Sequence, residues 1–130
     1  MKCLLDTHII LWLAENSQKL SSSAKAIILD EANEKYVSIA SCWEVSIKLS
    51  LNRLDLDGGA REFFNIIREN GLILLQVEED YLALLENLPF HHRDPFDRLI
   101  VVTAISEKLV LLTDDSQLSD YAGADLQIAS

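Results

Sequence analysis

The segment KCLLDTHIILWLA, residues 2–14, decides how the rest of the chain is interpreted. Its first residues form a short apolar run of strand length, and its last residues, 9–14, form an apolar run of helical length. Asp6 and His8 interrupt an otherwise apolar stretch. An ionised carboxylate among apolar neighbours is costly to desolvate unless another group compensates its charge. The segment therefore predicts a buried strand that ends at a functional acid, followed by a helix.

Runs of strand length recur along the chain and alternate with segments of helical periodicity. This alternation predicts the α/β class: a three-layer α/β/α sandwich around a central parallel sheet of four to five strands. The expected strands cover residues 2–5, 36–39, 72–77, 109–112 and 126–128. The expected helices cover residues 9–14, 24–32, 43–51, 60–70, 78–88, 95–108 and 117–121, with a serine of 21–23 capping the second and Gly71 ending the fourth.

The composition indicates one compact domain spanning residues 1–130, since 49% of the residues are hydrophobic and only four are Gly and two Pro. Cys3 and Cys42 are far apart and lack metal-ligand spacing, which predicts two reduced, buried thiols. No apolar stretch approaches the ~20 residues that span a bilayer, and no cleavable signal is apparent. We therefore expect a soluble, cytoplasmic protein without a membrane partner.

The formal net charge of −10 argues against a broad basic surface for nucleic acid. An acidic excess instead indicates solubility, a basic partner, or carboxylates gathered around cations. The positions of the acids distinguish these interpretations.

Acids recur just after the expected strands. Asp6 follows the first strand, Glu44 lies early in the helix after the second, and Asp97 lies at the start of the helix that precedes the fourth. The fourth strand is followed by Asp114 and Asp115, either of which can face the sheet edge. In a parallel sheet these positions share the edge where ligands bind. The sequence thus predicts one acidic cleft.

Some of these acids also have a purely structural interpretation. Asp6 can cap the first helix, with Thr7 sharing that role. Glu44 and Lys48 are spaced to form a surface ion pair, on a helix whose Trp43, Ile47 and Leu51 would make the buried stripe. We nevertheless favour a functional Glu44, because it stands beside a Trp at the head of a helix that follows a strand.

The motif DPFD separates its two acids by role. Pro95 favours the first helical position, so Asp94 becomes the N-cap and Asp97 the third helical residue. Asp94 then has a sufficient structural explanation. Asp97 projects from the first turn, where the helix dipole favours a carboxylate.

The histidines do not form a known catalytic motif. The chain has neither HExxH nor GxSxG, and His8 is best interpreted as a hydrogen-bonded, partly buried side chain. The run formed by His91, His92 and Arg93 is predicted to be a loop at the rim that meets phosphates.

Gathered carboxylates repel one another unless cations neutralise them. Oxygen ligands favour hard ions such as Mg²⁺ or Mn²⁺, and two such ions can promote hydrolysis of a phosphodiester bond without a His base. Thr7 and Thr113 stand beside candidate acids and are predicted to orient a carboxylate or a water molecule. The basic residues near the acids are the candidates for guiding a nucleic-acid backbone: Lys48, Arg53, Arg93 and Arg98.

Two other classes of function remain open at this point. Phosphoryl-transfer domains of the receiver or phosphatase type also gather acids at a sheet edge, although a haloacid-type phosphatase needs DxD where this chain has DTH. A non-catalytic RNA- or protein-binding module would tolerate loss of the carboxylates.

Four blocks, LLDTHIILWLA, SCWEVSIK, RDPFDRLIVVTA and LLTDDSQLSDY, together resemble the PIN-domain ribonucleases, most closely the VapC-type toxins of toxin–antitoxin pairs. The resemblance implies a PIN-like fold and Mg²⁺- or Mn²⁺-dependent endonucleolytic cleavage of RNA. It further implies inhibition by a cognate antitoxin and a homodimer. Matched position by position, the catalytic and metal-binding acids are Asp6, Glu44, Asp97 and Asp115, with Asp114 at the variable position.

The resemblance also gives the first helix a role. Because IILWLA has no polar face, this helix must be buried on more than one side. The second helix is one candidate to cover it, and a partner is the other. In VapC-type toxins such a groove receives an antitoxin helix, so Ile9, Trp12 and Leu13 are the candidate interface residues.

Overall fold

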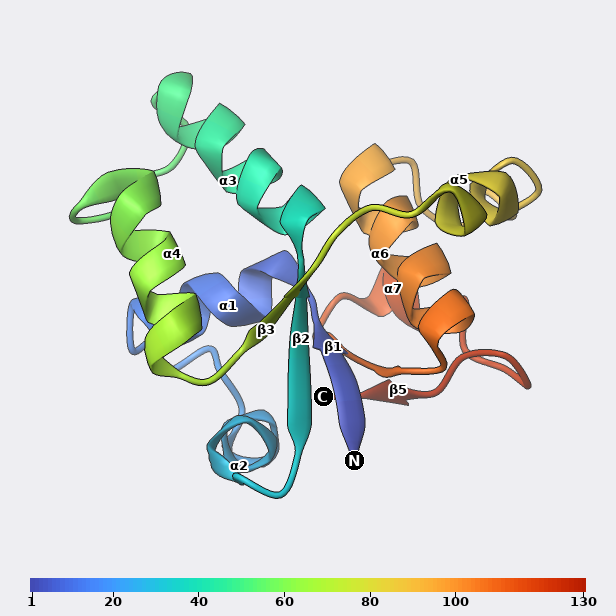
Figure 1. Ribbon diagram of the computed structural model, residues 1–130, viewed down its shortest axis with the longest axis horizontal. Coiled ribbons are helices and arrows are strands. Elements are labelled where there is room, and N and C mark those ends of the chain that lie inside the picture. Colours follow the sequence, from blue (N-terminus) through green and yellow to red (C-terminus); the bar gives the residue numbers. More distant parts are fainter.

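The protein, described by a computed structural model of residues 1–130, is built on a five-stranded, wholly parallel sheet (Figure 1). The strand order is β3-β2-β1-β4-β5. The strands are β1 (Lys2–Leu5), β2 (Glu34–Ser38), β3 (Ile73–Leu75), β4 (Val110–Leu112) and β5 (Ile128–Ala129). The helices are α1 (Thr7–Ala14), α2 (Ser22–Leu29), α3 (Ile39–Ser50), α4 (Gly59–Glu69), α5 (Glu79–Leu85), α6 (Pro95–Glu107) and α7 (Ser116–Ser119).

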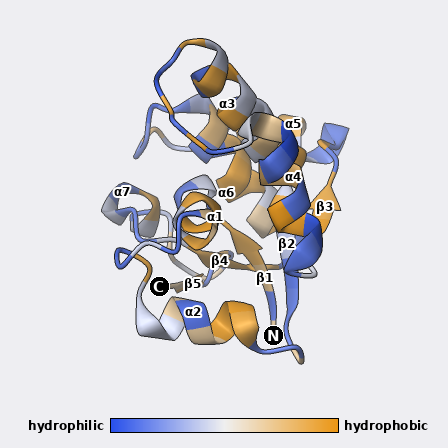
Figure 2. Ribbon diagram, turned by 90° about the vertical axis from the view of Figure 1, so that its left-hand side faces the viewer, coloured by the Kyte–Doolittle hydropathy of each residue, from blue (hydrophilic) through white to orange (hydrophobic).

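Helices cover both faces of the sheet, as the α/β/α expectation required. In Figure 1, α1, α2, α3 and α4 lie on one side and α5, α6 and α7 on the other. Two hydrophobic clusters correspond to these layers, and β1 contributes Cys3 and Leu5 to one and Leu4 to the other. Figure 2 shows the apolar residues concentrated on the strands and α1, inside a more polar exterior. The predicted fold class is confirmed.

The central strands end together. Leu5 of β1 is in register with Leu112 of β4, and the Asp6 N–H donates to the Leu112 carbonyl at 3.0 Å. Since all strands are parallel, the residues that follow β1 and β4 reach one edge of the sheet. This register brings Asp6 beside Thr113, more than one hundred residues away in sequence.

The expected caps and helix ends are largely confirmed. Ser21 caps α2 by accepting from the Ala24 N–H, and Gly71 lies just beyond α4 with a φ of 67°. At α6, Asp94 accepts from the backbone N–H groups of Phe96 and Asp97, with Pro95 in the first turn. Asp94 is therefore the cap that the DPFD motif predicts.

Helix α3 differs most from its prediction. It begins at Ile39, four residues before the expected start, because Ser38 caps it by accepting from the Ala40 N–H. The predicted buried stripe is wrong: Trp43 is 63% exposed and Leu51 is also exposed. Glu44 is buried instead, because the face of α3 that carries Ala40, Ser41, Glu44 and Val45 packs inward and Trp43 lies outside it.

The first helix packs against α4, and its buried residues belong to the same hydrophobic cluster as Ala24 and Ile28 of α2. Ile9 is packed in the core, which removes it from the candidate partner surface, whereas Trp12 and Leu13 are only half-buried. His8 is exposed and forms no hydrogen bond, so the prediction of a hydrogen-bonded, partly buried side chain is wrong. The two thiols, Cys3 and Cys42, are buried as expected, and burial raises the pKa of both.

No helix combines the length and the apolar character that crossing a bilayer requires.

Candidate active site

Asp6 stands at the end of β1 with its carboxylate almost wholly buried. It occupies the N-cap position of α1, yet its side chain accepts no capping hydrogen bond, so the capping interpretation fails. Oδ2 accepts from the Thr113 hydroxyl at 2.8 Å, and Oδ1 has no partner. Burial raises the pKa of Asp6, although the bond from Thr113 acts in the opposite direction. An unpartnered buried carboxylate oxygen is costly for the fold.

Glu44 repeats this pattern on α3. It is 3% exposed, Oε2 accepts from Lys48 Nζ at 2.8 Å, and Oε1 has no partner. Burial acts to lower the pKa of Lys48, but the hydrogen bond and charge of Glu44, with Asp94 and Asp97 nearby, raise it overall. The ion pair that the spacing predicts does form. Because the carboxylate is buried, it is not the simple surface pair of the structural interpretation.

Asp97 lies in the first turn of α6 and is the most strongly perturbed acid. Its pKa is raised to about 8, first by burial and then by the charges of the acids around it, Asp6, Asp94, Glu44 and Asp115. Repulsion from these groups shows that carboxylates from four separate segments share one region, as expected of acids that follow parallel strands.

Asp115, and not Asp114, joins this cluster. Asp115 Oδ1 caps the short α7, while Oδ2 lies 3.1 Å from Nε2 of His92. Asp114 is exposed and forms no hydrogen bond or ion pair. Thr113 donates to Asp6 and accepts from the Asp115 N–H at 3.1 Å. Thr113 thus positions two acids, in agreement with its predicted supporting role.

Thr7 performs a different task from the one predicted. Its buried hydroxyl donates to Ser41 Oγ at 2.8 Å, which ties the start of α1 to α3. It therefore contacts no acid, and it supports the site by holding together the helices that carry Asp6 and Glu44. Sequence reasoning missed Ser41, which is fully buried in the first turn of α3 and belongs to no recognised motif.

Arg98 is not available to guide a nucleic acid. It is 6% exposed and donates to the carbonyls of Leu88, Pro89 and His92, while its guanidinium stacks on Phe90 at 3.8 Å. Its role is to fix the loop that precedes α6. Arg53 and Arg93 remain exposed, as the prediction requires.

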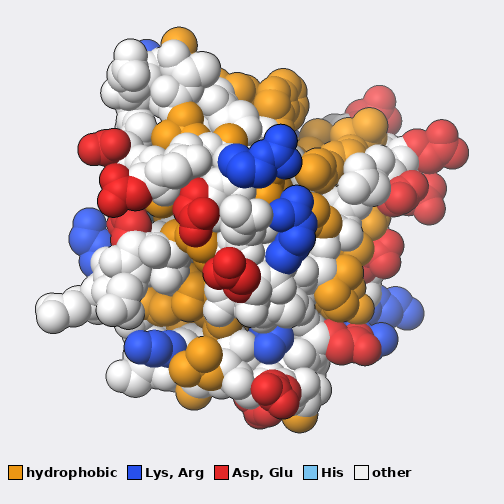
Figure 3. Space-filling view, turned by 60° about the vertical axis from the view of Figure 1, so that its left-hand side comes forward, with side chains coloured by type: hydrophobic (Ala, Val, Ile, Leu, Met, Phe, Trp, Pro, Cys, Tyr) orange, Lys and Arg blue, Asp and Glu red, His pale blue; other side chains and the backbone are white.

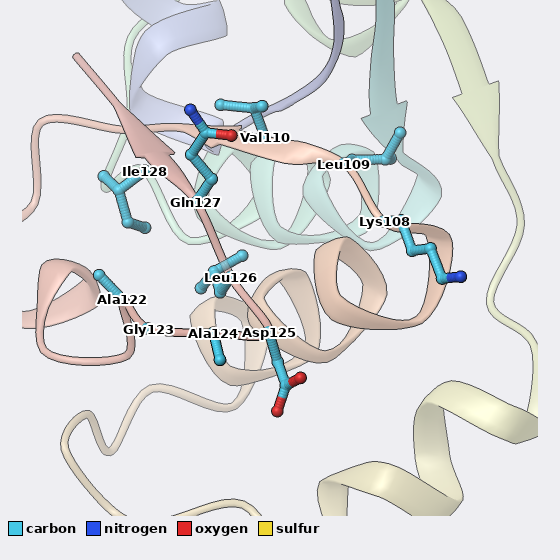
Figure 4. A pocket seen from close by; sticks show the side chains of 10 residues that line it. All are labelled: Lys108, Leu109, Val110, Ala122, Gly123, Ala124, Asp125, Leu126, Gln127 and Ile128. Atoms are coloured by element: carbon cyan, nitrogen blue, oxygen red, sulfur yellow. The ribbon is translucent and has the colours of Figure 1, made fainter.

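The molecular surface has no continuous basic stripe on the face that Figure 3 displays, where acidic, basic and apolar side chains are interspersed. The largest hollow, about 580 Å³, is remote from the acids in the fold: it is lined by residues 108–110 and 122–128, at the amino ends of β4 and β5 (Figure 4). Since the acids gather at the carboxyl ends of the strands, this hollow is not the site they form.

The acidic cluster fits a divalent cation. The ligand atoms are carboxylate oxygens, which hard divalent ions prefer. Asp6 Oδ1 and Glu44 Oε1 are buried without a partner, and burial together with the charges of the neighbouring acids raises the pKa of Asp97. His92, Asp97 and Asp115 also offer ligand atoms that lie within 4.8 Å of one another. A cation would satisfy the orphaned oxygens and offset the repulsion.

The protein is thus a parallel α/β/α sandwich that gathers Asp6, Glu44 and Asp97, all buried, with the half-buried Asp115. The sequence pattern of the PIN domain matches residues 3–124, and the chain belongs to the PIN domain family, in its VapC type. It is 30% identical over 122 residues to Ribonuclease VapC22 of Mycobacterium tuberculosis, covering 91% of this chain and 90% of that protein.

Solved structures agree on the fold. VapBC2 of Rickettsia felis, bound to a DNA fragment from its promoter, matches 99% of this chain and 98% of the compared chain, with a TM-score of 0.75 and 15% identity. FitAcB of Neisseria gonorrhoeae matches 100% of this chain and 97% of the compared chain, with a TM-score of 0.62 and 20% identity.

Proposed function

We propose that the chain is an endoribonuclease that acts as the toxin of a toxin–antitoxin pair and depends on Mg²⁺ or Mn²⁺. The observation that carries the proposal is the pair of buried, unpartnered oxygens, Asp6 Oδ1 and Glu44 Oε1, inside a cluster whose charges raise the pKa of Asp97. A purely structural cluster would have its oxygens satisfied by neighbouring donors. Membership of the PIN family and the similarity to Ribonuclease VapC22 support the same activity.

Asp6, Glu44, Asp97 and Asp115 are the residues that would hold the cation. When bound, a divalent cation supplies positive charge that stabilises the negative charge developing on the phosphate and makes water more acidic. Thr113 keeps the Asp6 and Asp115 side chains in register across β1 and β4. Lys48 holds one oxygen of Glu44 and leaves the other free to bind.

RNA would approach the acidic cluster past only a few basic side chains. Arg53 and Arg93 are exposed, and their charges are available to phosphates. Because the chain carries a formal net charge of −10, we expect modest and strongly salt-dependent binding of RNA outside the site. We therefore expect RNA recognition to be concentrated at the acidic cluster. We place the enzyme in the cytoplasm, where its RNA substrate occurs.

We also propose a cognate antitoxin and a homodimer. Among the similar structures is one titled as a toxin–antitoxin complex from Klebsiella pneumoniae. Trp12 and Leu13 on α1 are half-buried and packed only partly against the core, which leaves apolar area for a partner. Ile9 cannot contribute, because it is buried inside the protein.

The test compares purified wild-type protein with Asp6→Asn and Asp97→Asn variants on single-stranded RNA and on DNA of the same sequence. We expect the wild type to cleave RNA with Mg²⁺ or Mn²⁺ and to lose activity in EDTA, and both variants to be inactive at each metal concentration. Asp114→Asn is the matched control, since it removes an equal charge from an exposed neighbour and should keep full activity. RNA left intact by folded wild type with either ion would refute the nuclease assignment.

Growth provides the second test. Expression of the wild type alone should arrest growth, and coexpression with the gene beside it should restore growth. Arrest that persists in both Asn variants would mean that toxicity does not arise from cleavage at this cluster.

A further inference from the structure

His92 lies inside the acidic cluster, although the four-acid assignment gives it no role. Its Nε2 is 3.2 Å from Asp97 Oδ2 and 3.1 Å from Asp115 Oδ2, and its side chain is largely buried. One ring nitrogen therefore contacts two of the carboxylates that a cation would need. Either His92 is itself a metal ligand, or its ring occupies the position that a cation would take beside these two carboxylates.

The other ring nitrogen distinguishes these two possibilities. Nδ1 of His92 accepts a hydrogen bond from the Asp94 N–H at 3.0 Å. An accepting Nδ1 carries no proton, so the ring is the neutral tautomer with its proton on Nε2. Nε2–H then donates to Asp115 Oδ2, while Asp97 Oδ2 lies beside the same nitrogen at 3.2 Å. A nitrogen that carries a proton has no lone pair for a metal.

The loop holds the ring in this position. The Tyr121 hydroxyl accepts from the backbone N–H groups of both His91 and His92, each at 3.1 Å, and Arg98 donates to carbonyls within residues 88–92. To ligate through Nε2, His92 would have to move its proton to Nδ1, where it would meet the Asp94 N–H. That N–H, at the residue capping α6, would then lose its partner.

We infer that His92 is an internal occupant of the cation site: its Nε2–H donates to Asp115 and lies against Asp97, and the ring must leave before both of these oxygens can bind a metal. This inference rests on the proposed function. It predicts that His92 and the cation compete for the same oxygens. Asp6 Oδ1 and Glu44 Oε1, which the ring does not satisfy, remain the open part of the site.

The experiment measures binding of Mn²⁺ and of Mg²⁺ to the full chain by calorimetry, without RNA. His92→Ala removes the competing donor and should bind Mn²⁺ about tenfold more tightly, as expected for the loss of one hydrogen bond to charged groups. His92→Gln keeps an N–H donor of similar reach and should bind as the wild type does. His91→Ala is the matched control, because His91 is exposed in the same loop and contacts no acid.

A second readout identifies the coordinating atoms directly. Pulsed electron paramagnetic resonance of Mn²⁺ in the wild type should show no coupling from a directly bound ¹⁴N nucleus. Nitrogen NMR of the metal-free protein should show the His92 proton on Nε2. Observation of ¹⁴N coupling, or of weaker Mn²⁺ binding by both His92 variants, would overturn the inference and make His92 a ligand.

The remaining outcomes are equally decisive. Equal Mn²⁺ affinity in wild type and His92→Ala, with RNA cleavage intact, overturns the inference and leaves the proposed function standing. If no variant binds Mn²⁺ or Mg²⁺ although all of them are folded, both the inference about His92 and the proposed function are overturned. If His92→Ala unfolds, the His92→Gln variant and the resonance experiment still decide whether the nitrogen is bound.

Discussion

Replacing Asp97 by Asn should change how the stability of the metal-free protein depends on pH. The pKa of Asp97 is raised from 3.8 to about 8 by burial and by the neighbouring acids. Between these two values, the carboxyl group is protonated in the folded protein and ionised in the unfolded chain. The folded state therefore binds more protons, so the stability from this group is fully present below pH 3.8 and is lost as the pH rises through 8.

The magnitude follows from the number of protons. Between pH 5 and pH 7, folded Asp97 holds about one proton more than unfolded Asp97, so the free energy of unfolding falls by about 1.4 kcal/mol for each pH unit. The Asn variant has no such proton. The free energy of unfolding of Asp97→Asn, relative to wild type, should thus increase by about 2.7 kcal/mol from pH 5 to pH 7.

Urea denaturation in EDTA at pH 5, 6 and 7 measures this difference. Asp114→Asn provides the control: it removes an acid from the exposed neighbour of Asp115, where no contact distinguishes folded from unfolded protein. Its stability should parallel that of wild type at all three pH values. If Asp97→Asn also runs parallel to wild type, neither burial nor the neighbouring acids raise the pKa of Asp97, and the case for a cation loses its electrostatic basis.

Three further outcomes are expected. Excess Mn²⁺ at about one hundred times its dissociation constant should raise the free energy of unfolding of wild type by about 2.7 kcal/mol, and Asp6→Asn should lose most of that gain in a thermal melt. Thr113→Val should lower stability by about 1–3 kcal/mol in urea, because it removes the side-chain donor to Asp6 and the acceptor for the Asp115 N–H; unchanged stability would show that neither bond matters. Trp12→Glu should weaken antitoxin binding or shift the oligomeric state in light scattering, whereas a folded variant with neither change would remove α1 from the interface.

The fold was predictable because its signals are local. Apolar runs such as residues 2–5, the serine cap of α2 and the DPFD motif each specify an element or its boundary without reference to the rest of the chain. The acids of the site followed from one topological rule, that parallel strands end at the same edge. That rule grouped Asp6, Glu44 and Asp97 with the Asp114–Asp115 pair, and the resemblance to PIN domains was needed to favour Asp115 over Asp114.

The errors arose where tertiary contacts decide the outcome. The start of α3 depends on Ser38, and which face of α3 is buried depends on its tertiary packing, so the predicted burial of Trp43 was wrong and Glu44 is buried instead. Arg98 looked like a phosphate contact because it is basic and adjacent to an acid, yet loop carbonyls bury it. Likewise, nothing local to His92 indicates that its ring bridges Asp97 and Asp115, since the fold alone brings these groups together.

The polar groups around the cluster explain how the fold tolerates it without a cation. Three of the acids are only half satisfied by the protein: Thr113 occupies one oxygen of Asp6, Lys48 one oxygen of Glu44, and His92 lies against one oxygen of Asp97. Asp115 has both oxygens engaged, one by the Gln117 N–H and one by His92. If protein donors satisfied every carboxylate oxygen, the cluster would be a structural network with no oxygen left to bind a cation. Complete absence of donors would leave isolated buried charges, which few folds can carry. The intermediate arrangement keeps the protein folded while it leaves oxygen ligands available, and this is the arrangement that a dissociable divalent cation requires.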